Sequence, residues 1–519
     1  MTRFARVLSY FRSHDLATLG VCAVLFFFVY SAFYSGNHGL YPSPDEQANA
    51  VFAERFAQMG DLRIERSLLV DAVRPRSVNV FGADFVPGFF LGLVLLVGGI
   101  GALFGDWVIP FVPAAMAATA PITFYLLMRR VFGQKVARPA ALLLFFLPPW
   151  AYYASRSLLP NVAMLSTYLA GWAFLVAAHN RFDLKQRNRA IFFSMAAGLA
   201  FGLSFIIRPV ELVWSAGILF TAAVYFRSRL HVGLAFITFL LFLVPAFWLG
   251  YWQQQTYGAW QRTGYASLTS ELYLEVADGS SNLAVIAIGE LSQGLFPFGF
   301  SLLPAFERFF EQTVPWYWPL LVFTFFGFFA YRKQANKNPV QQLYSTVFVG
   351  LSAYLIIYYG SWVIQDHPDP DWVSIGTAYH RYWLPIFVMS LPYLAMGIES
   401  VAAQLQRRFV YTRSIVWMAV LTVCMILAFG YGDDSLGRLK ANSVKYEYLR
   451  AGVLAVTPPA SVIATERQDK LFWPERQVMT FADQDYSSVA RQARGIPVQL
   501  YILTALPANH MSVIEQRDF

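Results

Sequence analysis

Charged residues are scarce in this chain. Asp, Glu, Lys and Arg make up 13% of its 519 residues, whereas apolar residues make up 57% and aromatic residues 17%. Soluble domains carry about 25% charged residues. Many apolar runs also approach the ~20 residues that a helix needs to span a bilayer. The composition therefore excludes an ordinary soluble domain and indicates a multi-pass membrane protein.

Cysteine is equally scarce. The chain has two, Cys22 and Cys424, far apart in sequence and both inside apolar runs. They provide neither a disulfide framework nor metal-ligand spacing. The first apolar run, residues 16–33, lacks a convincing small-residue cleavage site. We therefore predict that this run is an uncleaved transmembrane helix.

Basic residues are concentrated in short loops between the apolar runs, although the net charge is only +8. This distribution is the positive-inside pattern of membrane proteins and not a nucleic-acid-binding surface. Arg3, Arg6 and Arg12 precede the first run, so the N-terminus is predicted to be cytoplasmic. The runs suggest an all-α polytopic protein in the cell membrane, with about twelve transmembrane helices.

The apolar runs at 85–104 and 108–128 conflict with this topology. Both look like spans. If both crossed the membrane, the chain would be outside again after the second run, but the basic cluster that follows this run predicts that the segment is inside. Pro110, Pro113 and Pro121 suggest that the second run is broken or only partly inserted. Alternatively, the short 140–153 run is not a full span. The basic cluster consists of Arg129, Arg130, Lys135 and Arg138.

Composition changes after the last apolar run, near residue 432. The segments ASVIAT, RQVMTF and VQLYIL are typical of short buried strands, and residues 485–494 are typical of a helix. We predict a membrane domain at 1–432 and a small extracytoplasmic α/β domain at 433–519. This second domain has no Gly-rich phosphate loop, so we assign it no nucleotide chemistry.

The first outer loop, residues 36–84, contains the sequence YPSPDEQANAVFAERFAQMGDL. Ser43 is a plausible helix N-cap, Pro44 suits the first helical position, and Glu46 falls three residues after the cap. Gly60 is a helix stop signal. The pattern predicts a helix at the membrane surface, with an apolar face made of Val51, Phe52, Phe56 and Met59.

Asp45 and Glu46 form an acid pair at the start of this helix, and two interpretations remain open. Glu46 closes a capping box in the first, and Asp45 favours the positive end of the helix dipole. In the second, the acids act as a general base or hold a divalent cation next to a membrane-bound substrate.

Several short motifs occur along the membrane region in a characteristic order. They are Pro44-Asp45-Glu46 with its following helix, RRVFG at 129–133, SRSLLPN at 155–161, TGY at 263–265 and GLFP at 294–297 in the long outer loop 251–310, and RYWLP at 381–385. Together they resemble glycosyltransferase family 39. This family of polytopic, GT-C type enzymes includes protein O-mannosyltransferases and the aminoarabinose transferases that modify lipid A. Asn161 departs from the pattern, because many relatives have Asp there.

The resemblance implies transfer of a sugar from a polyprenyl-phosphate donor to an acceptor hydroxyl on a lipid, glycan or protein outside the cytoplasm. Asp45 would be the base, and Glu46 would orient it or share a divalent cation with it. Positive charge would stabilise the leaving phosphate. The candidates for that role are Arg381, His380 and Tyr382, followed by Arg208, Arg156, Arg74 and Arg76.

Each of these residues also has a structural interpretation. An arginine at the end of a span often extends to the lipid headgroups, and Tyr382 could belong to an aromatic belt. His367 with Asp366, Asp369 and Asp371 could bind a divalent cation or form a solvated loop. The alternative function is a multi-pass transporter or lipid flippase. That class predicts ionisable residues in mid-membrane, but most charges here lie at span ends.

Overall fold

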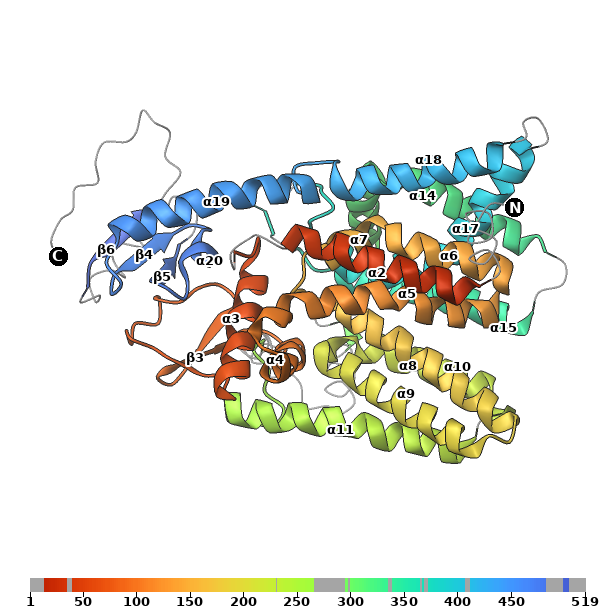
Figure 1. Ribbon diagram of the computed structural model, residues 1–519, viewed down its shortest axis with the longest axis horizontal. Helices are drawn as coiled ribbons and strands as arrows, with labels where there is room; N and C mark the ends of the chain where they lie inside the picture. Colours follow the sequence, from red (N-terminus) through yellow and green to blue (C-terminus); the bar gives the residue numbers. More distant parts are fainter. Residues whose placement is uncertain are drawn as a thin grey trace, which may run out of the picture. The chain divides into compact units, whose positions relative to one another are not determined.

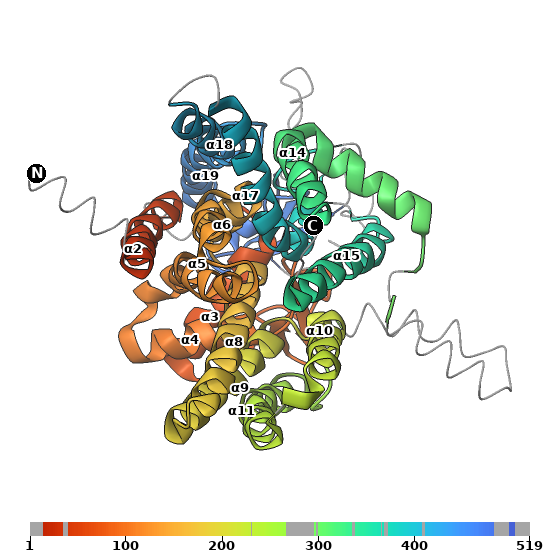
Figure 2. The ribbon, with the colours of Figure 1, turned by 90° about the vertical axis from the view of Figure 1, so that its right-hand side faces the viewer.

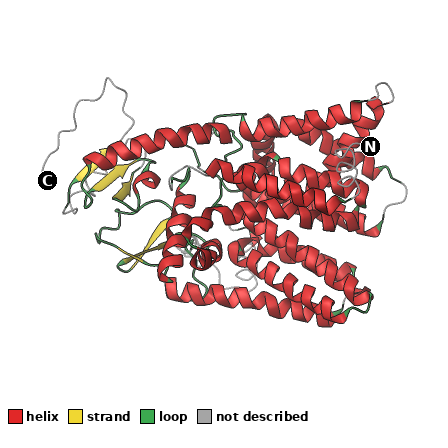
Figure 3. Cartoon of the chain, in the orientation of Figure 1, coloured by secondary structure: helices red, strands yellow, loops and turns green. Residues whose placement is uncertain are grey.

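The computed structural model describes residues 14–34, 40–229, 231–265, 295–296, 299–334, 338–364, 366–367, 372–406, 411–481 and 498–503. The chain divides into two compact units. The first contains Met1–Phe33, Phe111–Trp248 and Leu272–Arg438, and the second contains Tyr34–Pro110, Leu249–Glu271 and Leu439–Phe519. Helices dominate the described residues, as Figure 3 shows, which confirms the predicted polytopic, mainly helical class.

Nine helices among the described residues are long and apolar enough to cross a membrane. Within the first unit, α8 packs on α9, α14 packs on α17, and α5 packs on both α6 and α8 (Figures 1 and 2). The helices of this bundle are α2 (Asp15–Tyr34), α5 (Val112–Val131), α6 (Gln134–Phe146), α7 (Pro148–Ser155), α8 (Pro160–Asp183), α9 (Arg187–Ile207), α10 (Leu212–Tyr225), α11 (Val232–Tyr257), α14 (Leu302–Arg332), α15 (Pro339–Gly360), α16 (Ala378–Tyr382), α17 (Leu384–Gln406) and α18 (Thr412–Phe429).

The helices explain the conflict between the runs at 85–104 and 108–128. The first run begins in strand β3 (Asp84–Pro87) and continues as α4 (Gly92–Phe104), which has only 13 residues. At 1.5 Å per residue this helix is shorter than the bilayer core, so the prediction of a full span there is wrong. The second run is one continuous candidate span, Asp106–Val131, despite its prolines. The described residues thus hold nine candidate spans, compared with the predicted twelve or so.

The described part of the predicted first outer loop, residues 40–84, belongs to the second unit. Helix α3 (Pro44–Met59) packs on α4, and three strands form an antiparallel sheet in the order β1-β3-β2. The strands are β1 (Ile64–Glu65), β2 (Val78–Phe81) and β3. Sequence analysis predicted the helix but missed this sheet, because strands of two to four residues carry little periodic signal.

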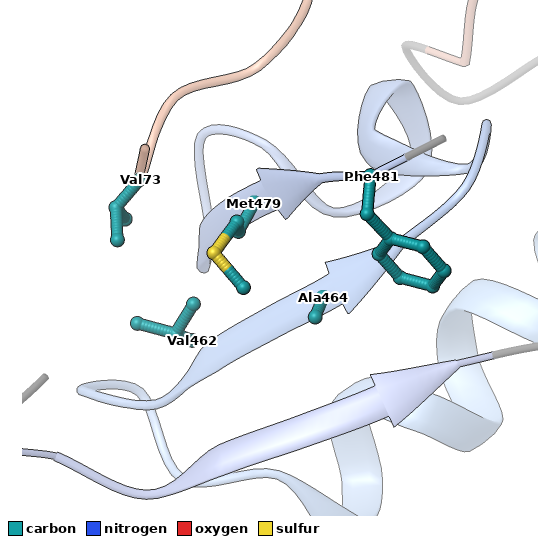
Figure 4. Close-up of a cluster of buried hydrophobic side chains, with 5 residues drawn as sticks. All are labelled: Val73, Val462, Ala464, Met479 and Phe481. Atoms are coloured by element: carbon teal, nitrogen blue, oxygen red, sulfur yellow. The ribbon is translucent and has the colours of Figure 1, made fainter. Parts of the chain in front are cut away.

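The three strands predicted near the C-terminus are confirmed. They are β4 (Val462–Thr465), β5 (Gln477–Thr480) and β6 (Leu500–Leu503), which form a parallel sheet in the order β5-β4-β6. Val462, Ala464, Met479 and Phe481 make a buried apolar cluster that also contains Val73 of the first outer loop (Figure 4). The predicted helix at 485–494 lies outside the described residues, and the domain boundary at residue 433 stays a prediction.

Candidate functional site

The start of α3 has the capping geometry that the sequence indicates. Ser43 is the N-cap, and its hydroxyl accepts a hydrogen bond from the Glu46 backbone N–H at 3.3 Å. The same hydroxyl donates to Glu46 Oε2 at 2.7 Å. At the other end, Gly60 has φ 62°, a left-handed conformation that suits glycine. Ser43 is therefore the N-cap, and its hydroxyl also binds the carboxylate of the buried Glu46.

Asp45 has a different partner. The hydroxyl of Ser77 donates to Asp45 Oδ1 at 2.6 Å, and the Asp45 side chain is half-buried. Ser77 precedes strand β2, so a segment 32 residues downstream holds this carboxylate. The two acids of the pair thus have different serine partners. Glu46 binds the N-cap residue Ser43, whereas Asp45 binds Ser77 of the loop before β2.

The buried face of α3 differs from the predicted apolar face. Phe52 is fully buried, but Met59 is 64% exposed. The buried residues lie mainly in the N-terminal half of the helix and include Gln47 and Asn49. Gln47 is buried because its amide donates to the Trp473 carbonyl at 3.1 Å. The prediction for Met59 is wrong because α3 packs through its first turns.

The two arginines of the first outer loop have different environments. Arg76 forms an ion pair with Asp469, with Nη2 at 2.6 Å from Oδ1, and it also donates to the Arg467 carbonyl. Arg74 is exposed. Since the charge of Arg76 is compensated by a buried carboxylate, its main observed contribution is to the folding of the second unit.

In the first unit, Tyr382 of α16 lies close to two of the predicted phosphate-binding arginines. The guanidinium of Arg208 lies 5.0 Å from the centre of the Tyr382 ring, and that of Arg381 lies 5.1 Å from it. These are cation–π distances. Arg208 is thus brought to the same aromatic ring as Arg381, from a segment far away in the sequence.

Sequence analysis missed two members of this cluster, Glu211 and Tyr359. Arg208 Nε donates to Glu211 Oε1 at 2.9 Å, and the hydroxyl of Tyr359 donates to the same oxygen at 2.6 Å. The Tyr359 ring stacks on Tyr382, with centroids 4.6 Å apart. A buried acid three residues after an arginine in an apolar region is a signal that could have identified Glu211.

The SRSLLPN turn lies against the segment that leads into α16. Tyr153 donates to the Thr377 carbonyl at 2.8 Å, and Asn161 donates to the Arg381 carbonyl at 3.0 Å. Burial raises the pKa of Tyr153, whereas the charges of Arg381 and Arg156 act to lower it. Arg156 also donates to Tyr152 at 3.1 Å. Arg156 and Arg381 therefore act electrostatically on the same small region.

His380 is completely buried, unlike its neighbour Arg381. Trp316 Nε1 donates to His380 Nε2 at 2.7 Å, and Thr377 lies 3.1 Å from Nδ1. Burial lowers the pKa of His380 to about 3. Its imidazole is therefore neutral at physiological pH, and the contacts with Trp316 and Thr377 fix the start of α16.

In the described part of the 361–383 segment, Asp366 and His367 each make a contact within the segment. Asp366 Oδ2 accepts the backbone N–H of Ala378 at 2.5 Å, which supports the first turn of α16. His367 stacks on Trp372 with centroids 4.3 Å apart. Asp369 and Asp371 lie outside the described residues. Within those that are described, no three His, Cys, Asp or Glu side chains are grouped to hold a metal ion.

A cavity of about 580 Å³ lies among α8, α9, α10 and α11. Its lining is mainly apolar and includes Tyr168, Trp172 and Phe242. Arg208 and Glu211 line it as well, so the charged cluster around Tyr382 borders an apolar space. The volume falls in the usual range for ligand sites, ~300–1,000 Å³.

The TGY motif lies against the first outer loop in the second unit. Asn79 donates to the Gly264 carbonyl at 2.5 Å, and Tyr265 packs on Phe90. A Cβ at position 264 would lie 2.3 Å from the backbone nitrogen of Phe89, so only glycine fits this approach. Of the GLFP motif, Gly294 and Pro297 lie outside the described residues.

The two groups of predicted site residues belong to different units. Asp45, Glu46, Arg74 and Arg76 are in the second unit, and Arg156, Arg208, His380, Arg381 and Tyr382 are in the first. The first group consists of a capped helix start with a held carboxylate. The second consists of arginines around a buried tyrosine beside an apolar cavity.

The helical arrangement is that of a GT-C type membrane protein. It is similar to the archaeal oligosaccharyltransferase AglB from Archaeoglobus fulgidus in complex with an inhibitory peptide and a dolichol-phosphate, with 14% identity over 95% of this chain and 69% of that one, at a TM-score of 0.54. The same enzyme tethered to an acceptor peptide containing the NVT sequon gives 0.56 at 14% identity, again over 95% of this chain and 69% of that one. ArnT from Cupriavidus metallidurans in the apo state gives 0.49 at 13% identity, over 92% of this chain and 87% of that one.

No family model and no curated protein sequence matches the chain. At these identities the structural likeness establishes the fold, and the predicted GT-C-like architecture is confirmed.

Proposed function

We propose that this chain is an integral-membrane glycosyltransferase that transfers a sugar from a polyprenyl-phosphate donor to an acceptor hydroxyl. The observation that carries the proposal is the position of Arg208 and Arg381 around Tyr382, with Arg208 also lining an apolar cavity. A polyprenyl phosphate has matching chemistry, because an anionic headgroup is joined to a long apolar chain. One structure with a similar fold is described in complex with a dolichol-phosphate.

The proposed reaction needs a base for the acceptor and positive charge for the leaving phosphate. Asp45 takes the proton of the acceptor hydroxyl as its oxygen attacks the anomeric carbon of the sugar. The bond from that carbon to the phosphate oxygen breaks, and the lipid phosphate leaves with its electron pair. Arg381, with Arg156 and Arg208 nearby, stabilises the negative charge on the leaving phosphate.

The two acids do not have equivalent roles in this proposal. Glu46 accepts the Ser43 hydroxyl and supports the helix start, so we assign the proton transfer to Asp45 alone. We assign no metal ion to the reaction, because the two carboxylates have different observed partners. Addition of EDTA to the purified enzyme is therefore expected to leave the transfer rate unchanged, and a rate restored only by Mg²⁺, Mn²⁺ or Zn²⁺ would contradict this assignment.

The direct test of the proposal offers undecaprenyl-phosphate mannose, glucose and aminoarabinose to the purified protein, with a membrane extract as the source of acceptor hydroxyls, and follows each donor by mass spectrometry. We expect consumption of at least one donor with release of undecaprenyl phosphate. The transporter alternative predicts intact donor that changes leaflet in proteoliposomes. Movement of intact donor without release of its sugar would contradict the proposal.

We also propose that the first outer loop and the C-terminal domain lie outside the cytoplasm, because the basic loops follow the positive-inside pattern. Arg74 and Tyr448 are exposed, as is Leu184 in a basic turn. In a background without Cys22 and Cys424, we expect Arg74→Cys and Tyr448→Cys to react with a membrane-impermeant maleimide in intact cells, and Leu184→Cys to be protected. The reverse labelling pattern would contradict this topology.

A further inference from the structure

Asp469 is a fully buried carboxylate that accepts three hydrogen bonds from one residue, Arg76. The backbone N–H of Arg76 donates to Oδ2 at 2.8 Å, while Nε and Nη2 donate to Oδ1 at 3.0 and 2.6 Å. Nη2 also donates to the Arg467 carbonyl at 2.6 Å. Because both the main chain and the guanidinium are bound, Asp469 fixes the position and direction of the chain at Arg76.

The next residue in the chain is the partner of Asp45. Ser77 has φ 62°, in the left-handed region that non-glycine residues adopt rarely. Its carbonyl accepts the N–H of Gly88 at 3.0 Å, and its hydroxyl donates to Asp45 Oδ1 at 2.6 Å. The bound backbone of Arg76 therefore sets where the Ser77 hydroxyl meets Asp45.

The same C-terminal segment also contacts the start of α3. Lys470 Nζ donates to the Pro42 carbonyl at 2.7 Å, and the Gln47 amide donates to the Trp473 carbonyl at 3.1 Å. Residues 469–473 thus hold the chain on both sides of Asp45 and also the loop that supplies its hydrogen-bond donor. All of these residues belong to the second unit.

We infer that Asp469 is a positioning residue for Asp45, acting through Arg76 and Ser77. The C-terminal domain then has a role in catalysis although none of its residues contacts the reacting atoms. The inference rests on the proposed function only in its kinetic part. The physical link among Asp469, Ser77 and Asp45 can be measured without any substrate.

Hydrogen–deuterium exchange in the full-length protein tests that link. In Asp469→Asn, we expect faster exchange in peptides covering 41–48 and 73–80, with unchanged exchange in β4. The matched control is Asp61→Asn, the same chemical change in the same unit at a side chain that is 47% exposed and pairs with the part-exposed Arg55. Unchanged exchange around Asp45 in Asp469→Asn would overturn the inference.

Kinetics on a donor that the wild type consumes test the positioning role. A small misplacement of a reacting group can cost about 10²-fold in rate, so Asp469→Asn and Arg76→Gln are each expected to lower kcat by roughly 10–100-fold, with little change in KM for the donor. The double variant should lose no more than the worse single variant, because both act through one path. Losses that multiply, or an effect confined to KM, would contradict the inference.

Ser77 supplies a second set of variants in case Asp469→Asn does not fold. Ser77→Gly keeps a residue suited to the left-handed backbone but removes the hydroxyl, so it should fold normally and lose kcat. Ser77→Asn tolerates the same backbone and restores a donor, so it should recover part of the rate. Full activity in Ser77→Gly would overturn the inference. Absence of sugar transfer in the wild type would contradict the proposed function, and the exchange data would then decide the link alone.

Discussion

The side-chain amide of Asn161 donates a hydrogen bond to the backbone carbonyl of Arg381, 3.0 Å away and 220 residues later in the chain. Asn161 is the second residue of α8, and Arg381 lies in α16, so one bond joins the SRSLLPN and RYWLP motifs. A carboxylate has no hydrogen to donate and would face the carbonyl oxygen with a negative charge.

Asn161→Asp should therefore be harmful. We expect a lower Tm and a loss of transfer rate, because the half-buried Arg381 carbonyl loses its donor, at a cost of up to about 1–3 kcal/mol. Asn180→Asp makes the same change in the same helix, where the amide donates to the Val176 carbonyl within α8. The control should show a smaller rate loss. Equal or higher activity in Asn161→Asp would contradict this explanation.

Arg381 is predicted to bind the donor phosphate. Two variants separate the contribution of its positive charge from that of its planar guanidinium. Arg381→Ala should weaken donor use strongly, and Arg381→Lys should recover it only in part, because lysine lacks the planar fork of guanidinium donors. Steady-state kinetics with varied donor concentration measures both. Arg413→Ala removes an exposed arginine that pairs with Glu399, and it should have no effect. Wild-type donor kinetics in both Arg381 variants would remove this residue from the site.

Buried His380 should make the protein sensitive to mild acid. Its pKa is lowered to about 3 in the folded protein, whereas the unfolded value is near 6.5. Between these values the unfolded chain binds the extra proton, so stability is full above pH 6.5 and falls as the pH decreases. At pH 5 the loss is about 2 kcal/mol.

Thermal unfolding of detergent-solubilised protein from pH 7.5 to 5 measures this sensitivity. His380→Gln should show a smaller decrease in Tm than the wild type, because it has no proton to take up at this position. His179→Gln, a change at a half-buried histidine of α8, should keep the wild-type decrease. An equally steep acid decrease in His380→Gln would show that other groups cause it.

Local sequence patterns predicted the parts of the fold that local chemistry determines. Ser43 and Gly60 marked the two ends of α3, and the apolar alternation around Val462 marked β4. Apolar run length alone predicted the membrane class. It failed for α4, because a run of apolar residues does not show that its first residues join a sheet.

Other features were missed because they are contacts between residues far apart in sequence. Glu211 pairs with Tyr359, and Arg76 pairs with Asp469, 148 and 393 residues away. Neither pairing leaves a periodic pattern in one chain. For the same reason the sequence suggested Arg76 as a phosphate ligand without revealing its buried carboxylate partner, Asp469.

The central claim is that Asp45 is the base for sugar transfer, and the rate of transfer by Asp45→Asn tests it most directly. Asn tolerates a helix start, and the lost dipole interaction at this half-buried terminus is worth at most ~2 kcal/mol. Loss of a general base typically costs about 10²–10⁴ in rate. Asp61→Asn, at a half-exposed acid that pairs with Arg55 just after the same helix, is the matched control. We predict near-normal Tm in both proteins, with a rate loss of about 10²–10⁴ in Asp45→Asn only. Wild-type transfer by a well-folded Asp45→Asn protein would contradict the claim and leave Asp45 with a structural role at the start of α3.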